Sequence, residues 1–467
     1  MDKPPADGKS VRHPGQCNME ETRSSHDWIL FYRNIAPAPM TSQPARFLPL
    51  HPVARLLAAL FLPLALAACN GGGGDDNEAA APPVEQPAEA PTRNTAYLNT
   101  KAGDVIQVRI EELRPTQAAI GYDQIYYKLG RWQGDFNRSW AGDDARKLDY
   151  LDRTVGKKFD DYCEDMGGTE RAAAFADLAA AQAARLDDPS TFTCLDAPGT
   201  HTENLKTVVV GWDGNLYLTD GHHTFSSLRE IFDGGPKLPV WVKVDANYSD
   251  LTTAAAFWQR MVDERRAWLR DGQNQPITVD QLPTRLGLAS ADEAGGMQED
   301  RYRSLVYFTR DIAYENGSLP EFAEFLWGDW LRRQAAGGQL PTLDQYRMVA
   351  PATPAQILAA STLNASLVPG GANDSYAAAV RDASLKMGAL ADTDIVFDDR
   401  QAASLGRIPL AANVAAGVSI KDQRDALEEL PRIDVKADGS PRNAGKLWFA
   451  VHYRACGKPA AGTCWGW

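Results

Sequence analysis

The pattern that most constrains the fold lies at residues 207–218, which read TVVVGWDGNLYL. Two short runs of β-branched, aliphatic and aromatic residues flank Asp213-Gly214-Asn215. An Asp-Gly pair between such runs is typical of a tight turn that joins two antiparallel strands. We therefore predict a β-hairpin that ends near Asp220.

The residues after the hairpin, TDGHHTFSSLREI, predict a change from strand to helix. Gly221 breaks the strand, and the apolar side chains beyond it recur at helical spacing. The buried face of this helix is expected to hold Phe225, Leu228, Ile231 and Phe232. His222 and His223 then fall in the first turn, where free backbone N–H groups and the positive end of the helix dipole favour an anion.

The rest of the body shows both strand and helix signals. Alternating apolar residues predict strands at 105–110 and 238–246. A helix follows Gln117 and runs through Ile125 and Lys128. Further helical patterns occur at 140–190, at 252–270, at 301–333 with a break near Gly317 to Pro320, and in two or three Ala-rich segments after residue 340. The last apolar segment, KLWFAVHYRAC at 446–456, is predicted to be a strand. The predicted fold class is α+β, with strands and helices at 97–250 and a mainly helical region at 251–467.

An apolar run near the N-terminus carries a signal for export. Residues 56–68 read LLAALFLPLALAA, which is too short to span a bilayer comfortably, and Arg46 and Arg55 precede it. The run ends in Leu-Ala-Ala-Cys69, which resembles a bacterial lipoprotein signal. We therefore predict a signal peptide at 40–68, cleavage before Cys69, and lipidation of that cysteine. A buried core helix is the alternative.

This interpretation also divides the chain around the signal. Met40 supplies a start, so we expect residues 1–39 to be an over-extended gene start that takes no part in the fold. Residues 69–96, rich in Gly, Asp, Ala and Pro, are expected to be a flexible tether. Asn70 follows the lipidated cysteine and favours sorting to the outer membrane, with the body facing the periplasm.

An exported body would contain four cysteines, Cys163, Cys194, Cys456 and Cys464. An even number of cysteines in an oxidising compartment indicates disulfides. Three pairings exist, and proximity in the sequence favours Cys163–Cys194 and Cys456–Cys464. Buried free thiols are the alternative, and a zinc site is disfavoured because no CxxC pair is present.

The overall charge limits the classes of partner. The chain has 48 basic and 61 acidic side chains, for a formal net charge of −13. This excess of acidic side chains argues against electrostatic binding of nucleic acid by the surface as a whole, although it allows a local basic groove.

Several segments resemble a known family. They are LRPTQAAIGYDQIYYK at 113–128, LYLTDGHHTFSSL at 216–228, YRSLVYFTRD at 302–311 and FAEFLWGDWLR at 322–332. Their order resembles the ParB/sulfiredoxin fold and, within it, the ParB-like nuclease family. The resemblance implies a small mixed sheet with helices. It also implies that Gln117 and Lys128 lie near the turn at Gly221. Convergence of Asp220, His222, His223, Thr116 and Lys128 on one open pocket would distinguish an enzyme from a binding module.

The resemblance gives the turn a chemical meaning. In chromosome-partitioning ParB proteins the equivalent turn reads Gly-x-Arg/His-Arg and cradles nucleotide phosphates, and in sulfiredoxins it reads Gly-Cys-His-Arg. Here Gly221 agrees and His223 matches the sulfiredoxin histidine. His222 replaces the reactive cysteine, which excludes the sulfiredoxin reaction. Thr224 replaces the phosphate-binding arginine, so lower nucleotide affinity is expected.

Two functions remain open at this stage. In the first, the chain is a hydrolase of phosphodiesters or other phosphate esters, and a nucleic acid is a candidate partner. The phosphate would be bound by Gly221, Thr224, Lys128, Thr116 and Gln117. His223 would transfer the proton, while His222 and Asp220 would orient it or help to hold a divalent metal, whose requirement stays open.

In the second, the chain is a binding or assembly module that keeps the fold and has lost the chemistry. His222 would then pack against the helix start, and His223 would bond to backbone. The net acidity and Thr224 favour this module, whereas the Asp-Gly-His-His run and Lys128 favour the enzyme.

Overall fold

The computed structural model describes residues 93–457, except for 139, 141–142, 170–171, 316, 318, 352, 363–373, 411–420, 434, 437 and 441. The predicted extension at 1–39 and signal at 40–68 lie outside the described residues, as do most of the tether, Cys69 and Cys464. Within the described ranges, no helix is both long enough and apolar enough to cross a membrane.

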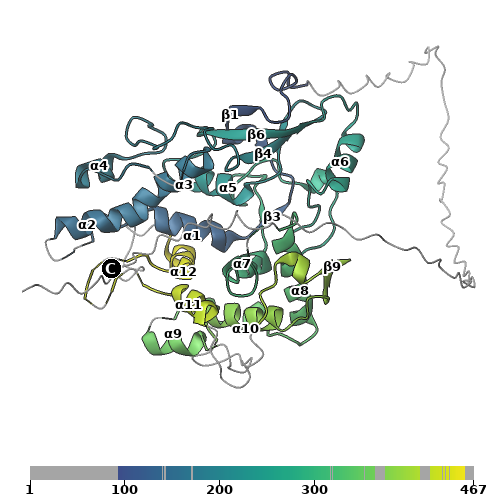
Figure 1. Ribbon diagram of the computed structural model, residues 1–467. Helices are drawn as coiled ribbons and strands as arrows, with labels where there is room; N and C mark the ends of the chain where they lie inside the picture. Colours follow the sequence, from purple (N-terminus) through teal and green to yellow (C-terminus); the bar gives the residue numbers. More distant parts are fainter. Residues whose placement is uncertain are drawn as a thin grey trace, which may run out of the picture. The chain divides into compact units, whose positions relative to one another are not determined.

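A five-stranded mixed sheet organises the first part of the body (Figure 1). From edge to edge its strands are β1 (Val105–Arg109), β6 (Pro239–Asn247), β4 (Lys206–Val210), β5 (Leu216–Leu218) and β2 (Leu113–Arg114). β4 and β5 form the predicted antiparallel hairpin, with Val210 opposite Leu216. β1 pairs with β6 antiparallel, whereas β4–β6 and β2–β5 are parallel. The predicted hairpin and the mixed sheet are confirmed.

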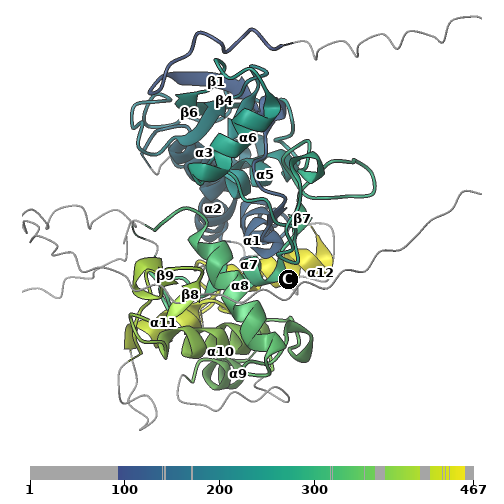
Figure 2. The ribbon, with the colours of Figure 1, turned by 90° about the vertical axis from the view of Figure 1, so that its right-hand side faces the viewer.

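The two faces of the sheet pack against different helices, because alternate side chains of a strand point to opposite sides. One core contains Val208, Val210, Leu216, Leu218, Phe225 and Leu228. It is completed by α1 (Tyr122–Trp132) and α3 (Lys157–Asp165), beside α5 (His222–Glu230). The other core contains Val209, Tyr217, Phe257 and Met261, and α6 (Ala254–Asp263) supplies the last two (Figure 2).

The helix α5 begins where the turn chemistry predicts, directly after Gly221. Phe225, Leu228 and Ile231 are buried as expected. The prediction for Phe232 is wrong, because 51% of this residue is exposed. The helix ends at Glu230 and Ile231 has an extended backbone, so Phe232 no longer follows the helical periodicity.

The segment 140–190 is less helical than predicted. α2 (Asp144–Leu151) continues through a π-helical turn (Asp152–Gly156) into α3, and only the short α4 (Leu178–Ala183) follows. A disulfide between Cys163 and Cys194 ties the end of α3 to the irregular segment beyond α4, which confirms the first predicted pair. The second pair includes Cys464, which is outside the described residues, and stays a prediction.

The region after residue 251 is mainly helical, as predicted. It contains α6, α7 (Arg301–Phe308), α8 (Ala323–Ala336), α9 (Pro354–Ala360), α10 (Tyr376–Gly388), α11 (Lys421–Glu429) and α12 (Lys446–Cys456). This region also contains the strand pair β8 (Ile395–Phe397) and β9 (Arg400–Gln401). Its strand β7 (Gln298–Glu299) pairs with β3 (Ala119–Ile120), which lies in the first part of the body.

Two predicted elements in this region are corrected. The helix predicted at 252–270 ends at Asp263, and Trp268 instead forms a β-bridge with Gln117. The strand predicted at 446–456 is the helix α12, which lies along α1. Arg454 on α12 donates from Nε to Asp123 on α1 at 2.7 Å, and the Tyr453 ring lies 5.5 Å from that of Tyr126, so the two helices are in direct contact.

Candidate functional site

The turn between β5 and α5 requires a glycine. Gly221 has φ of 96°, in the left-handed region, and a Cβ at this position would lie 2.5 Å from Cγ of Lys206. The first helical hydrogen bond of α5 runs from the Phe225 N–H to the Gly221 carbonyl, and no side chain caps the helix. The N–H groups of His222, His223 and Thr224 therefore precede the hydrogen-bonded ladder.

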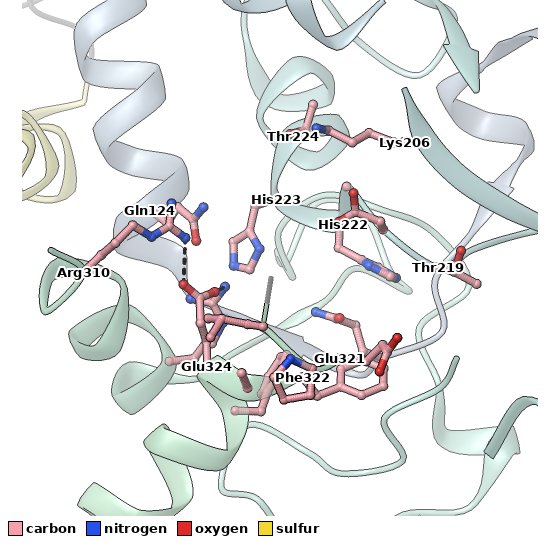
Figure 3. A pocket seen from close by; sticks show the side chains of 18 residues that line it. Gln124, Lys206, Thr219, His222, His223, Thr224, Arg310, Glu321, Phe322 and Glu324 are labelled. Carbon is pink, nitrogen blue, oxygen red and sulfur yellow. Dashed lines mark hydrogen bonds and ion pairs between the residues drawn. The ribbon is translucent and has the colours of Figure 1, made fainter. Parts of the chain in front are cut away.

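A cavity of about 500 Å³ opens in front of this helix start (Figure 3). Its walls come from the first turn of α5, from the end of the hairpin, from Gln117 and Gln124, from α7 and from the start of α8. Six of the predicted site residues line it: Gln117, Asp220, Gly221, His222, His223 and Thr224. Thr116 and Lys128 do not belong to its lining.

His222 is held by the predicted residue Thr116. The Thr116 N–H donates to Nε2 of His222 at 3.2 Å, and the Thr116 hydroxyl donates to the Leu218 carbonyl at 2.7 Å. Burial lowers the pKa of His222 to about 3. The ring is therefore neutral near pH 7, and because Nε2 accepts a hydrogen bond, Nδ1 carries the proton.

His223 is in a similar state. Its Nε2 accepts the Gly121 N–H at 3.0 Å. Burial lowers its pKa well below the ordinary value, and the nearby Arg303 charge lowers it further. Neither imidazole makes a hydrogen bond through Nδ1 with another described residue. Each ring therefore offers the cavity an N–H donor, and neither has the near-neutral pKa of an efficient general base.

The positive charge at the base of the cavity comes from residues that the sequence did not single out. Arg303 on α7 and Arg310, just beyond it, both form ion pairs with Glu324 on α8; the Arg310 Nη2 atom is 2.7 Å from Oε1. Tyr314 also donates its hydroxyl to Glu324. These partners hold the pKa of Glu324 well below its ordinary value despite its burial.

Some N–H donors of the Arg303 and Arg310 guanidinium groups have no hydrogen-bond partner among the described residues. Nε and Nη1 of Arg303 and Nε of Arg310 are buried without a hydrogen-bond partner in the described part of the chain. Arg303 is only 5% exposed. The buried Arg303 and the partly buried Arg310 thus share the one partly buried carboxylate of Glu324, which leaves one positive charge in excess. The remaining carboxylates of the lining, Asp220 and Glu321, are exposed and are screened by solvent.

The two lysines beside the turn share one carboxylate. Asp165 lies 3.2 Å from Nζ of Lys206 and 3.9 Å from Nζ of Lys128. Asp165 raises the pKa of Lys206, which lines the cavity. Burial disfavours the charge of Lys128, but Asp165 and Asp161 outweigh it and raise its pKa. Lys206 therefore lines the cavity itself. Lys128 does not line it and is connected to Lys206 through their shared partner Asp165.

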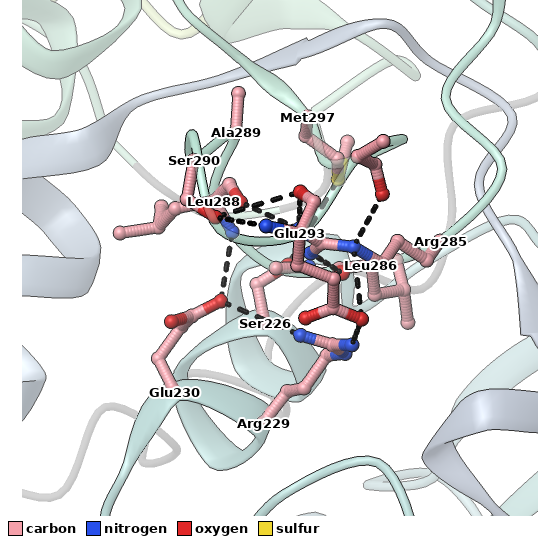
Figure 4. Close-up of polar contacts among 12 residues, drawn as sticks. Ser226, Arg229, Glu230, Arg285, Leu286, Leu288, Ala289, Ser290, Glu293 and Met297 are labelled. Carbon is pink, nitrogen blue, oxygen red and sulfur yellow. Dashed lines mark hydrogen bonds and ion pairs between the residues drawn. The ribbon is translucent and has the colours of Figure 1, made fainter.

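A loop at 285–297 supports α5 from the side away from the turn (Figure 4). The Gly287 N–H donates to the Ser226 hydroxyl at 3.0 Å, and the Leu288 N–H donates to Glu230 at 2.9 Å. Arg229 forms an ion pair with Glu293. These contacts lie in the C-terminal half of α5, so the helix is held in place by bonded contacts as well as by the core.

No group of three or more His, Cys, Asp or Glu side chains arranged to hold a metal ion occurs in the described ranges. Within these ranges the cavity offers hydrogen-bond donors and guanidinium groups rather than a ligand set. Such an arrangement can bind an oxyanion without a metal.

Comparison with known proteins places this cavity in a family domain. Residues 106–333 match the family model described as "Putative ParB-like nuclease", and all residues of the cavity lining fall within this range. The resemblance carried by the quoted segments is thereby confirmed. Among solved structures, protein Atu1540 from Agrobacterium tumefaciens matches at 22% sequence identity, with a TM-score of 0.30, over 50% of this chain and 80% of that chain. No curated protein matches the chain.

Proposed function

We propose that this chain, which carries a domain of the ParB-like nuclease family at residues 106–333, binds a phosphate ester in the cavity at the start of α5. The backbone N–H groups of the first turn bind one phosphoryl oxygen. The Nδ1–H groups of His222 and His223 and the Thr224 hydroxyl donate to the others. Arg303 and Arg310 supply the charge that Thr224 lacks.

The observation that carries the proposal is the pair of arginines, Arg303 buried and Arg310 partly buried, whose buried N–H groups have no hydrogen-bond partner among the described residues. A buried hydrogen-bond donor without a partner costs about 1–3 kcal/mol, and more when it is charged. An oxyanion that enters the cavity would satisfy these donors and balance the excess positive charge. The neutral histidines favour the same ligand, because each presents a donor and neither competes as a cation.

The test is binding of inorganic phosphate and of a phosphate diester to the purified protein, measured by calorimetry at low ionic strength. Arg303→Gln and Arg310→Gln should each weaken binding roughly 10- to 150-fold, which corresponds to loss of about 1.5–3 kcal/mol for a charged hydrogen bond.

Arg301→Gln is the matched control. Arg301 is on the same helix and pairs with Asp344 at the surface, outside the cavity. Circular dichroism checks the fold of all three variants. Binding by Arg310→Gln that equals that of the wild type would refute the proposal.

Hydrolysis of the bound ester is the second candidate, and the family description favours it. Nε2 of each histidine, the nitrogen that could accept a proton, already accepts a backbone N–H, which favours a binding role for both rings, so we propose that a carboxylate at the mouth acts as the base. Asp220 is exposed and lines the cavity next to Gly221. Asp220→Asn should keep binding and lose turnover in a panel of phosphodiesters and nucleic acids, assayed with and without divalent metals. If the wild type binds these esters but hydrolyses none of them, the hydrolase is excluded and the chain acts as a binding module.

We also propose that this activity belongs to the cell envelope. The apolar run at 56–68 and Cys69 support a lipid anchor in the outer membrane, and the Cys163–Cys194 disulfide suits an oxidising compartment. In that setting the ligand would be an extracytoplasmic phosphate ester or nucleic acid.

A further inference from the structure

Lys206 lines the cavity but has no role in the proposed function. It is the first residue of β4, and its side chain runs so close to the turn that a Cβ at Gly221 would lie 2.5 Å from Cγ of Lys206. In the view of Figure 3, His223 lies between Lys206 and Arg310. Because Lys206 belongs to the sheet, it presents positive charge to the cavity from a different wall than the two arginines of the α7 region.

The ammonium group of Lys206 is paired with Asp165, the last residue of α3. Oδ1 of Asp165 is 3.2 Å from Nζ of Lys206, and Oδ2 is 3.9 Å from Nζ of Lys128, so the two lysines use separate oxygens. The Asp165 side chain is only 10% exposed. A carboxylate at such a position is costly without a partner, and Lys128 would remain as a partner if Lys206 moved away.

Lys128 is the more firmly held of the two lysines. Its ammonium group lies 5.3 Å from the Trp132 ring centroid, and Asp165 and Asp161 both raise its pKa. The Trp132 ring is buried and donates from Nε1 to Asp161 at 2.9 Å, so the surface under Lys128 is itself fixed. By contrast, within the described ranges Asp165 is the one carboxylate that forms an ion pair with Lys206. Lys206 is therefore the member of the trio that can turn toward the cavity.

We infer that Lys206 is a further binding residue of the cavity, whose ammonium group leaves Asp165 and binds the phosphate group when the ligand enters. This inference rests on the proposed function. Asp165 and Lys128 act as positioning residues. Asp165 holds Lys206 beside the turn before binding, and Lys128 compensates the Asp165 charge afterwards. The exchange adds a third cation to the anion site and leaves none of the three side chains without an oppositely charged partner.

The test measures binding of inorganic phosphate to the purified protein by calorimetry. Lys206→Met should weaken binding roughly 3- to 30-fold, because a charged hydrogen bond is lost while one partly buried ion pair no longer has to be broken. Asp165→Asn frees Lys206 and should strengthen binding roughly 2- to 5-fold. Lys128→Met ties Asp165 more strongly to Lys206 and should weaken binding by a similar factor, whereas Lys128→Arg keeps the charge and should bind like the wild type.

Double variants separate this exchange from a general effect of charge on the anion. In the Lys206→Met background, Asp165→Asn and Lys128→Met should each change phosphate binding by less than about twofold, because both act through Lys206. Effects of the same size in both backgrounds would overturn the inference, since the two residues would then act on the anion directly. Phosphate binding by Lys206→Met that equals that of the wild type would also overturn it and leave the proposed function intact.

Lys237→Met is the matched control, because Lys237 is exposed and lies outside the cavity lining. It should bind phosphate like the wild type, and circular dichroism checks the fold of every variant. Equal weakening by Lys237→Met and Lys206→Met would reveal a nonspecific effect of net charge and overturn the inference. If the wild type itself binds no phosphate, the proposed function fails and the inference fails with it.

Discussion

Replacement of Glu324 by glutamine should lower stability and strengthen anion binding at the same time. Among the described residues, Glu324 is the one carboxylate that pairs with both Arg303 and Arg310, and its own side chain is 15% exposed. Breaking a buried ion pair by removing one partner costs about 3–5 kcal/mol. Glutamine can still accept hydrogen bonds from Tyr314 and from one arginine, so we expect a loss near the lower end, about 3 kcal/mol.

The same change should increase affinity for phosphate. The buried charge of the cavity rises from one excess cation to two. At an effective dielectric constant of about 20, an added unit charge a few ångströms away contributes about 3 kcal/mol before solvent and side-chain relaxation. We therefore expect phosphate to bind at least about tenfold more tightly to Glu324→Gln than to the wild type.

Urea denaturation with and without phosphate measures both effects. At a phosphate concentration equal to the wild-type Kd, mass action stabilises the wild type by about 0.4 kcal/mol and a tenfold tighter variant by about 1.4 kcal/mol. Chloride at equal ionic strength controls for screening. Asp344→Asn, at the exposed Arg301 pair, should change stability by less than about 1 kcal/mol. Equal phosphate stabilisation of wild type and Glu324→Gln would refute the assignment of this cluster to the anion.

Four further results are expected. The pKa of His222 is about 3 in the folded chain and about 6.5 in the unfolded chain, so the unfolded state binds the proton more readily. The free energy of unfolding should therefore fall as the pH drops from 6.5 toward 3, and His222→Gln should reduce this pH dependence in urea titrations. Gly221→Ala should destabilise the protein by about 1–3 kcal/mol in thermal melts, because alanine is strained at φ of 96°. Replacing Cys163 and Cys194 by serine should lower the free energy of unfolding by about 2–4 kcal/mol in the same melts. A wild-type melting temperature that does not change when reductant is added would contradict the disulfide. Cys69→Ser should move the protein out of the membrane fraction or leave its precursor unprocessed, and unchanged fractionation would exclude the lipid anchor.

Local patterns in the sequence were sufficient to predict the hairpin and α5. The Asp-Gly turn sets the register of β4 and β5, and Gly221 marks the start of the helix, because both depend on backbone preferences of a few neighbouring residues. The segment at 446–456 was assigned wrongly for the opposite reason. Its five consecutive apolar residues, LWFAV, show no clear period, so the local pattern does not distinguish a buried helix from a strand, and the contacts of α12 with α1 and with the core of the helical region come from distant parts of the chain.

The site was predictable in part. The turn residues reach the cavity as expected, since they are adjacent in the sequence. Arg303, Arg310 and Glu324 were inside segments quoted for the family resemblance, but no local rule assigns a charge among aromatic residues to a site. The seven-residue spacing of the two arginines in an apolar segment was the available signal. Their convergence depends on tertiary packing, in which Gly121 admits the backbone of Ser304; a Cβ there would lie 3.0 Å from its nitrogen.

The charged residues of the cavity lie on or next to α7 and α8, so they follow the sheet in the sequence, and this order affects when a ligand can bind during folding. All five strands of the sheet are available once the nascent chain has passed Asn247, and the turn at Gly221 can form with them. Arg303, Arg310 and Glu324 are synthesised later. A phosphate ligand therefore has no buried guanidinium to bind until the chain has extended through Glu324, and it can stabilise only molecules in which α7 and α8 have already docked. The ligand would then stabilise fully folded molecules and would not stabilise folding intermediates in which only the sheet has formed.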